Sequence, residues 1–192
     1  MTMKTTTYQP GQNIIDIKKK YRLKKVVKLA SNENPSGPSS KALIAGKKIL
    51  NSINRYPDSK SVELRQIIKK YLSKSYITTD NIMIGNGSNE ILEFIARQYL
   101  NEKSEVLFCK HSFLVYKIIS RNMRARIIES KPIMKPGLEH LSIDLDDMRS
   151  RVTNKTSVIF IANPSNPTGT ALNINKITKF IESLPKKIII VI

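Results

Sequence analysis

The chain has 192 residues, and its 33 lysines and arginines against 15 aspartates and glutamates give it a formal charge of +18. Its one cysteine, Cys109, excludes an intramolecular disulfide and cysteine-based zinc fingers, and only two histidines make a His-rich metal site unexpected. No segment approaches the roughly 20 apolar residues of a membrane-spanning helix, and residues 1–10 lack the apolar core of a signal peptide. We therefore expect a cytoplasmic protein with neither a bound metal nor a membrane association.

The positive charge has two interpretations. A nucleic-acid-binding protein would gather its lysines in one basic groove interleaved with aromatic residues. Here the lysines are scattered in short groups on the polar sides of amphipathic segments, such as Lys18–Lys20, Lys69–Lys70 and Lys186–Lys187. We therefore favour a solvated basic surface with a general attraction for phosphorylated, anionic ligands.

Pro- and Gly-containing turns divide the first part of the chain into separate segments. In chain order these are a polar, basic arm over residues 1–27, a loop over 28–38, a helix from Ser39 or Ser40 to about Asn51, a turn over 54–58 and an amphipathic helix over 60–74.

From residue 81 onward, short apolar runs alternate with segments of helical periodicity. Strands are predicted at 81–84, 105–109, 125–129, 157–162 and 187–192, and helices at 91–100, 113–122, within 143–152 and at 173–184. This alternation predicts crossover connections and a mostly parallel sheet, so the fold class is α/β.

The last predicted strand is almost wholly apolar, from Ile188 to Ile192. A strand of this composition is expected to be buried on both faces of a parallel sheet. Because site residues follow the carboxyl ends of such strands, we expect the chain to be a segment of a longer protein. Alone, its unpaired edge is expected to make the segment poorly soluble.

A glycine-rich turn, Gly85 to Glu90, lies between a predicted strand and a predicted helix. The first amides of a helix have no intrahelical acceptor, and the helix dipole favours an anion there by about 0.3–2 kcal/mol. The amides of Ser88 and Asn89 could therefore hold a phosphate. The turn is not a Walker A loop, because no Gly-Lys-Ser/Thr follows it, and Glu90 replaces the third glycine of the dinucleotide fingerprint. An ordinary turn capped by Ser88 is the alternative.

A second turn, Asn163-Pro164-Ser165-Asn166-Pro167-Thr168-Gly169, follows the strand predicted at 157–162. Each proline fixes its own φ and restricts the asparagine before it, so the backbone aims the carboxamide of Asn166. Gly169 lets the chain turn away or approach a ligand closely. Ligands of open α/β sheets bind at the carboxyl ends of strands, which makes this turn a candidate ligand site rather than a plain Pro-rich turn.

These segments together resemble the fold-type I aminotransferases that use pyridoxal 5′-phosphate (PLP), and most of all the histidinol-phosphate aminotransferases. The matching pieces are Leu29–Pro35, Arg55–Asp58, Gly87–Glu90, Phe113–Tyr116 and Asn163–Gly169, which cover most of the chain. The resemblance implies the three-layer, mostly parallel sheet of the PLP-binding large domain, incomplete at its carboxyl end. Residues 54–192 would form that portion, and residues 1–53 an N-terminal arm and part of a small domain.

Four matching residues are implied to bind the cofactor. The amides of Ser88 and Asn89 would hold the PLP phosphate, and Asn166 would donate a hydrogen bond to the 3′ oxygen of the ring. Phe113 matches the aromatic residue that stacks on the pyridine ring, although a core phenylalanine is the alternative.

Other residues are implied to reach the substrate or the neighbouring subunit. Tyr56 matches a tyrosine that contacts the phosphate of the partner's cofactor, so the resemblance implies a homodimer when the protein is complete. The loop from Asn32 to Gly37 would lie near the substrate. Tyr116 and His111 are expected to be structural, and Cys109 to lie in the core of a strand.

Two catalytic groups of the family have no counterpart in this sequence. PLP chemistry needs a Schiff-base lysine and a carboxylate that keeps the pyridine nitrogen protonated. The resemblance places both beyond Ile192. Lys74, after Ser73, lies in an amphipathic helix and is expected to be solvated. The catalytic residues are therefore unknown, and these 192 residues alone are expected to be inactive in transamination.

The leading hypothesis is a transaminase of histidine biosynthesis that moves an amino group between glutamate and imidazole-acetol phosphate. A PLP-dependent decarboxylase of a phosphorylated amino acid, or another amino-acid aminotransferase, would share the same fold. A basic nucleic-acid-binding protein and a non-catalytic remnant are less favoured, and no specific nucleic acid partner is expected.

Overall fold

The computed structural model describes residues 12–192. Contacts between residues divide the chain into one compact unit that ends at Ile84 and another that begins at Gly85. We call these the N-terminal unit and the C-terminal unit. The domain boundary predicted between residues 53 and 54 is a different division and stays a prediction.

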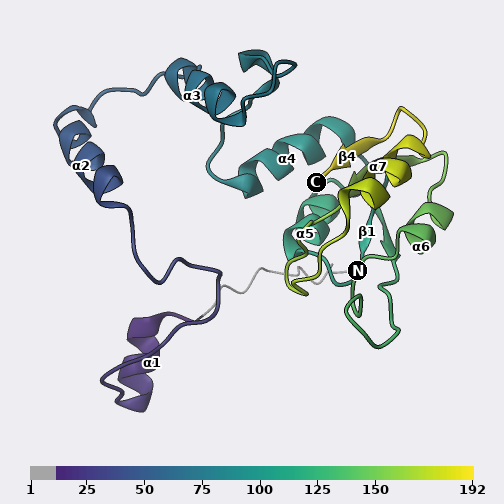
Figure 1. Ribbon diagram of the computed structural model, residues 1–192, viewed down its shortest axis with the longest axis horizontal. Coiled ribbons are helices and arrows are strands. Elements are labelled where there is room, and N and C mark those ends of the chain that lie inside the picture. Colours follow the sequence, from purple (N-terminus) through teal and green to yellow (C-terminus); the bar gives the residue numbers. More distant parts are fainter. Residues whose placement is uncertain (1–11) are drawn as a thin grey trace. The chain divides into compact units, whose positions relative to one another are not determined.

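The N-terminal unit consists of short helices joined by turns (Figure 1). They are α1 (Ile14–Tyr21), α2 (Ser40–Ile49), the 3₁₀ helix η1 (Leu50–Ser52), α3 (Val62–Leu72) and the 3₁₀ helix η2 (Thr79–Asn81). The helices predicted at about 40–51 and 60–74 are thereby confirmed. Helix α1 falls in the predicted arm, whose first eleven residues lie outside the described part of the chain.

Local capping explains why α1 and α3 form. The Asn13 side chain accepts a hydrogen bond from the Ile15 amide at 2.8 Å, which caps the start of α1. Ahead of α3, the Asp58 carboxylate accepts from the amides of Lys60 (2.9 Å) and Val62 (2.8 Å). These bonds to the charged form lower the pKa of Asp58.

The C-terminal unit alternates helices with strands. Its elements are α4 (Ser88–Tyr99), β1 (Glu105–Cys109), α5 (Leu114–Asn122), β2 (Arg126–Ser130), α6 (Leu145–Ser150), β3 (Thr156–Phe160), α7 (Ile174–Glu182) and β4 (Ile189–Val191). The four strands form one parallel sheet in the order β2-β1-β3-β4. The predicted α/β class and parallel sheet are confirmed.

Alternate residues of the strands pack into two separate cores, one on each face of the sheet. On one face Phe108 and Phe160 pack with residues of α4 and α5. On the other face Leu107 and Ile159 pack with Met148 of α6 and with residues of α7. The unit therefore has three layers, with the sheet between two helical layers. Cys109 is buried in the second core, as predicted.

Two strand predictions need correction. Residues 81–84 are not a strand: Asn81 ends η2, and Ile82 is extended but joins no ladder within the described chain. The apolar pattern was right for an extended segment, but a strand also requires a pairing partner. Strand β4 exists, yet Ile189–Val191 are only half-buried, because among residues 12–192 β4 pairs only with β3, at the edge of the sheet.

None of the helices in the described part of the chain has the length and apolar character that crossing a lipid bilayer requires.

Candidate functional site

The predicted site residues divide between the two units. Ser88, Asn89, Phe113 and Asn166 belong to the C-terminal unit, whereas Tyr56, Asn32 and Gly37 belong to the N-terminal unit. Strands β1 and β3 are parallel neighbours, with Phe108 opposite Phe160. The segments that follow these strands, which carry Phe113 and Asn166, therefore leave the sheet at the same edge. We call this the carboxyl edge.

The first turn of α4 presents open backbone amides. The N-cap is Gly87, with φ +76°, and no side chain in the described part of the chain caps the helix. The alternative in which Ser88 is the cap is therefore wrong, because Ser88 is already the first helical residue. No residue of the described chain accepts a hydrogen bond from the amides of Ser88 or Asn89, and both side chains are exposed. These amides and the helix dipole make the turn suitable for an anion.

The glycines before α4 are tightly constrained. The Gly87 amide donates to the Gly85 carbonyl at 2.9 Å, and the Asn86 amide donates to the Glu90 carboxylate at 2.6 Å. Glu90 thus reaches back from the helix to the turn. From the sequence, Glu90 is only the residue that replaces a third glycine, and its contact with the Asn86 amide is not predicted.

The turn after β3 is held by its own first asparagine. The carboxamide of Asn163 accepts from the Leu172 amide at 2.7 Å and donates to the Leu172 carbonyl at 3.3 Å. The carboxamide therefore pairs with Leu172 as a backbone peptide group would, and it closes the base of the loop. Sequence reasoning gave weight to Asn166 and missed this role of Asn163.

Within that loop, backbone hydrogen bonds leave Asn166 available. The Ser165 amide donates to the Thr170 carbonyl at 2.7 Å, and the Gly169 amide, with φ +71°, donates to the Ser165 carbonyl at 2.8 Å. Both Asn-Pro peptide bonds of the loop are cis. Asn166 is exposed, and its carboxamide has no hydrogen-bond partner among residues 12–192.

An aromatic stack supports the loop after β1. The Tyr116 ring stacks on Phe160 with centroids 4.5 Å apart, and Phe113 meets Tyr116 edge-on at 5.9 Å. Tyr116 packs, as predicted, and its burial raises the pKa of its phenol. Phe113 is half-buried, so it has a core contact on one side and accessible surface on another.

Two further side chains lie in the loop after β1. The hydroxyl oxygen of Ser112 is buried and has no hydrogen-bond partner in the described structure, which is unusual for a buried polar atom. From the sequence alone, the one reason to consider Ser112 as a site residue is that it directly precedes Phe113. His111 is exposed.

The candidate residues of the N-terminal unit lie in two exposed turns. Asn32, with φ +51°, and Gly37, with φ +77°, belong to a turn that Asn34 organises. The Asn34 side chain accepts from the Ser36 amide at 3.0 Å and donates to the Gly37 carbonyl at 3.1 Å. Tyr56 is fully exposed. The functional roles of Asn32, Gly37 and Tyr56 stay predictions.

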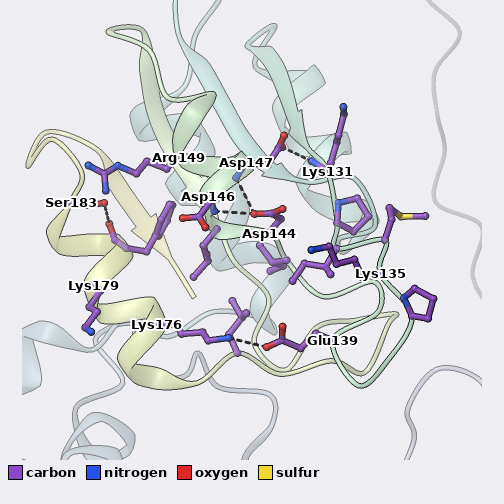
Figure 2. Close-up of a pocket in the computed structure, with 18 residues that line it drawn as sticks. Lys131, Lys135, Glu139, Asp144, Asp146, Asp147, Arg149, Lys176, Lys179 and Ser183 are labelled. Atoms are coloured by element: carbon purple, nitrogen blue, oxygen red, sulfur yellow. Dashed lines mark hydrogen bonds and ion pairs between the residues drawn. The ribbon is translucent and has the colours of Figure 1, made fainter.

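A large hollow lies elsewhere in the C-terminal unit, between residues 131–136, α6 and α7 (Figure 2). Its volume is about 1020 Å³, and none of the predicted site residues lines it. Several of its charges are satisfied internally. Lys176 pairs with Glu139 at 2.8 Å, and the Asp147 carboxylate accepts from the Lys131 amide at 2.7 Å. The hollow therefore does not include Phe113, Asn166 or the start of α4.

Ion pairs beside this hollow lower the pKa values of two of its acidic groups. The hydrogen bond from Arg151 lowers the pKa of Asp147, and the hydrogen bond from Lys176 lowers the pKa of Glu139. Across residues 12–192, no group of three or more histidine, cysteine or acidic side chains could hold a metal ion.

Comparison with known proteins points to one enzyme family. Residues 24–192 match the model of "Aminotransferase class I and II". The chain is 39% identical over 185 residues to "Histidinol-phosphate aminotransferase 1" of Idiomarina loihiensis, covering 96% of this chain and 48% of that protein. It is 40% identical over 187 residues to "Histidinol-phosphate aminotransferase" of Methylobacillus flagellatus, with the same two shares. The chain thus spans about half the length of these curated relatives.

Solved structures agree on the fold. Histidinol-phosphate aminotransferase from Sinorhizobium meliloti, solved in complex with pyridoxal-5′-phosphate, superimposes with a TM-score of 0.81 over 98% of this chain and 49% of its own, at 18% identity. The histidinol-phosphate aminotransferase from Clostridium acetobutylicum gives a TM-score of 0.67 at 26% identity, over 79% of this chain and 42% of its own. The α/β unit is therefore part of the PLP-dependent transferase fold.

Proposed function

This chain belongs to the class I and II aminotransferase family, and from that premise we propose that its protein transfers an amino group between glutamate and imidazole-acetol phosphate in histidine biosynthesis. The observation that carries the proposal is the first turn of α4, where Gly87 leaves the amides of Ser88 and Asn89 open to an anion. A phosphorylated cofactor is the ligand that the family implies at such a turn.

The residues of the carboxyl edge and of the start of α4 suit PLP. Open amides at the start of α4 match a phosphate, and the exposed carboxamide of Asn166 offers a donor that no neighbour uses. Phe113 supplies a half-buried aromatic ring held edge-on by Tyr116. When bound, PLP supplies an electron sink that stabilises negative charge on the substrate carbon bearing the amino group.

Each residue has one physical task in this proposal. The amides of Ser88 and Asn89 bind and orient the phosphate, and the basic surface raises the local concentration of anions. The Nδ2 group of Asn166 donates to the ring oxygen, and because bonds of Asn163 and Gly169 fix its loop, little backbone freedom is lost on binding. Phe113 covers one side of the ring and excludes water there.

The N-terminal unit is proposed to serve the substrate and the partner subunit. Tyr56 would reach the phosphate bound by the partner of a homodimer, which agrees with its complete exposure in a single chain. The turn from Asn32 to Gly37 would border the substrate. We propose a cytoplasmic location, in keeping with histidine biosynthesis.

The 192 residues of this chain are proposed to be insufficient for turnover. The lysine that bonds to the cofactor, and the carboxylate that pairs with its ring nitrogen, are proposed to lie outside these residues. Residues 54–192 are proposed to belong to the large domain, and residues 1–53 to the arm and small domain. A 192-residue protein that releases 2-oxoglutarate from glutamate and PLP would contradict the first point.

The experiment uses protein expressed from the complete natural reading frame. With PLP and glutamate, it should release 2-oxoglutarate in a half-reaction, and the aminated form should then convert imidazole-acetol phosphate to histidinol phosphate. Release of CO₂ from a phosphorylated amino acid would favour the decarboxylase instead. Half-reactions only with unphosphorylated amino acids would indicate another aminotransferase, and the absence of any reaction would reject the proposal.

A further inference from the structure

The start of α4 carries a variant of one half of a capping box. In the complete motif, the side chain of the N-cap residue binds an amide of the first turn, and a glutamate three residues later accepts from the backbone amide of the N-cap residue. Here the N-cap is Gly87, which has no side chain to donate or accept. Glu90 stands three residues after the N-cap, as in the motif, but its carboxylate accepts from the amide of Asn86, one residue before the N-cap, at 2.6 Å.

The turn is built to leave room for this carboxylate. A Cβ atom added to Gly85 would lie 2.9 Å from Glu90 Oε2 and 2.9 Å from Ile91 Cδ1, closer than such atoms approach. Glu90 is itself half-buried, so its position is restricted. The missing cap at Gly87 keeps the Ser88 and Asn89 amides open, while the contact between Glu90 and Asn86 restrains the turn beside them.

We propose that Glu90 is a positioning residue for phosphate binding: it holds residues 85–87 so that the amides of Ser88 and Asn89 converge on the phosphate of PLP. The inference rests on the proposed function and adds a requirement to it. Glu90 acts through the turn and does not touch the phosphate.

The sign of the expected effect separates this role from simple electrostatics. A carboxylate near a bound phosphate repels it, so removal of the charge alone should tighten binding. Removal of the contact to Asn86 should instead weaken binding, because the turn then samples conformations that do not present the amides. Charge and contact can be removed separately at this one position.

Three variants separate the two effects. Glu90→Asp keeps the charge but is one methylene too short to reach the Asn86 amide. Glu90→Gln keeps an acceptor oxygen at the same reach and loses the charge. Glu93→Gln is the matched control, since Glu93 lies on the same helix and pairs with Arg97 at 2.7 Å rather than with the turn.

The measurement is the dissociation constant for PLP and for pyridoxal, which lacks the phosphate, on protein from the complete reading frame. Glu90→Asp should weaken PLP binding about tenfold, as expected for one lost hydrogen bond to a charged group, and leave pyridoxal binding unchanged. Glu90→Gln and Glu93→Gln should bind PLP at least as tightly as the wild type. Thermal melts of the free proteins should show that all three variants fold.

Two outcomes would overturn the inference alone: wild-type PLP affinity in Glu90→Asp, or an equal loss of PLP and pyridoxal affinity in that variant. Weaker PLP binding in Glu90→Gln than in Glu90→Asp would also overturn it, because charge rather than reach would then matter. A wild-type protein that binds no PLP would reject the proposed function, and this inference with it.

Discussion

The two units of the chain have similar helices but different interiors. Helices α1, α2 and α3 contain no buried residue, whereas α4, α5 and α7 each bury at least two. The sequence of α3 shows the same kind of amphipathic spacing as those of α4, α5 and α7, so the difference lies in what the apolar side meets. In the C-terminal unit it meets a sheet face. Helical periodicity therefore predicts a helix and its apolar side, but not the surface that covers that side.

The apolar residues left exposed in the N-terminal unit are numerous. They include Leu29, Leu43, Ile44, Ile49, Ile53, Ile67 and Tyr71. An exposed apolar surface of this extent is typical of a protein interaction surface. The proposed homodimer would provide a partner surface that covers these residues.

The largest expected effect comes from the core of the C-terminal unit. Phe160 is fully buried and stacks on Tyr116, so Phe160→Ala should lower the free energy of unfolding by about 3–5 kcal/mol. Tyr71, 86% exposed on α3, is the matched aromatic control, and Tyr71→Ala should cost less than about 1 kcal/mol. Urea unfolding measures both. Equal losses would show that a partner surface covers α3.

A second effect depends on pH. Arg151 and the Lys131 amide favour the charged form of Asp147 and lower its pKa from the ordinary 3.8. Its contribution to stability is therefore complete above the ordinary pKa and is lost as pH falls through the lowered value. Asp147→Asn should cost about 1–2 kcal/mol at neutral pH.

The difference in unfolding free energy between wild type and Asp147→Asn should shrink below pH 3.8. Urea melts at a series of pH values measure it. A difference that stays constant into acid would show that the pair with Arg151 contributes no charge-dependent stability.

The third prediction contrasts the two asparagines of the loop after β3. Asn163→Ala removes both bonds to Leu172 and should cost about 1 kcal/mol, seen as faster hydrogen exchange at the Leu172 amide. Asn166→Ala removes no internal bond and should leave exchange unchanged while weakening PLP binding. The assignment fails if Asn166→Ala destabilises the loop as much as Asn163→Ala does.

The smallest effect belongs to the N-terminal unit. Asn13→Ala removes the cap of α1 and should cost about 0.5 kcal/mol, because the helix is exposed and short. Proton exchange of the α1 amides measures it. A loss of several kcal/mol would mean that α1 packs against another surface in the protein.

Sequence reasoning predicted the C-terminal unit well, for a physical reason. From β1 to β4 the strands alternate with amphipathic helices, and this local pattern and the tertiary structure agree. The strand predicted at 81–84 failed, because pairing depends on a partner elsewhere in the chain. Helix α1 was missed because its three isoleucines were too few to show a period, although Asn13 was a usable cap signal.

The parts of the candidate site that depend on backbone conformation could be predicted from the sequence. The parts that depend on contacts of particular side chains could not. Gly87 and the residues after it indicated open amides by their order alone. The sequence offers many possible hydrogen-bond partners for Asn163 and for Glu90. Only the folded structure shows that these partners are Leu172 and Asn86. For the contact of Glu90 with Asn86, the available sequence signal was the spacing of three residues between Gly87 and Glu90.

The most direct test is a crystal structure of the protein, expressed from its complete reading frame, with PLP bound. We predict that phosphate oxygens lie about 2.7–3.2 Å from the backbone nitrogens of Ser88 and Asn89. A phosphate bound away from the start of α4, for example in the hollow beside Lys131 and Lys176, would contradict the assignment of this turn as the anion site.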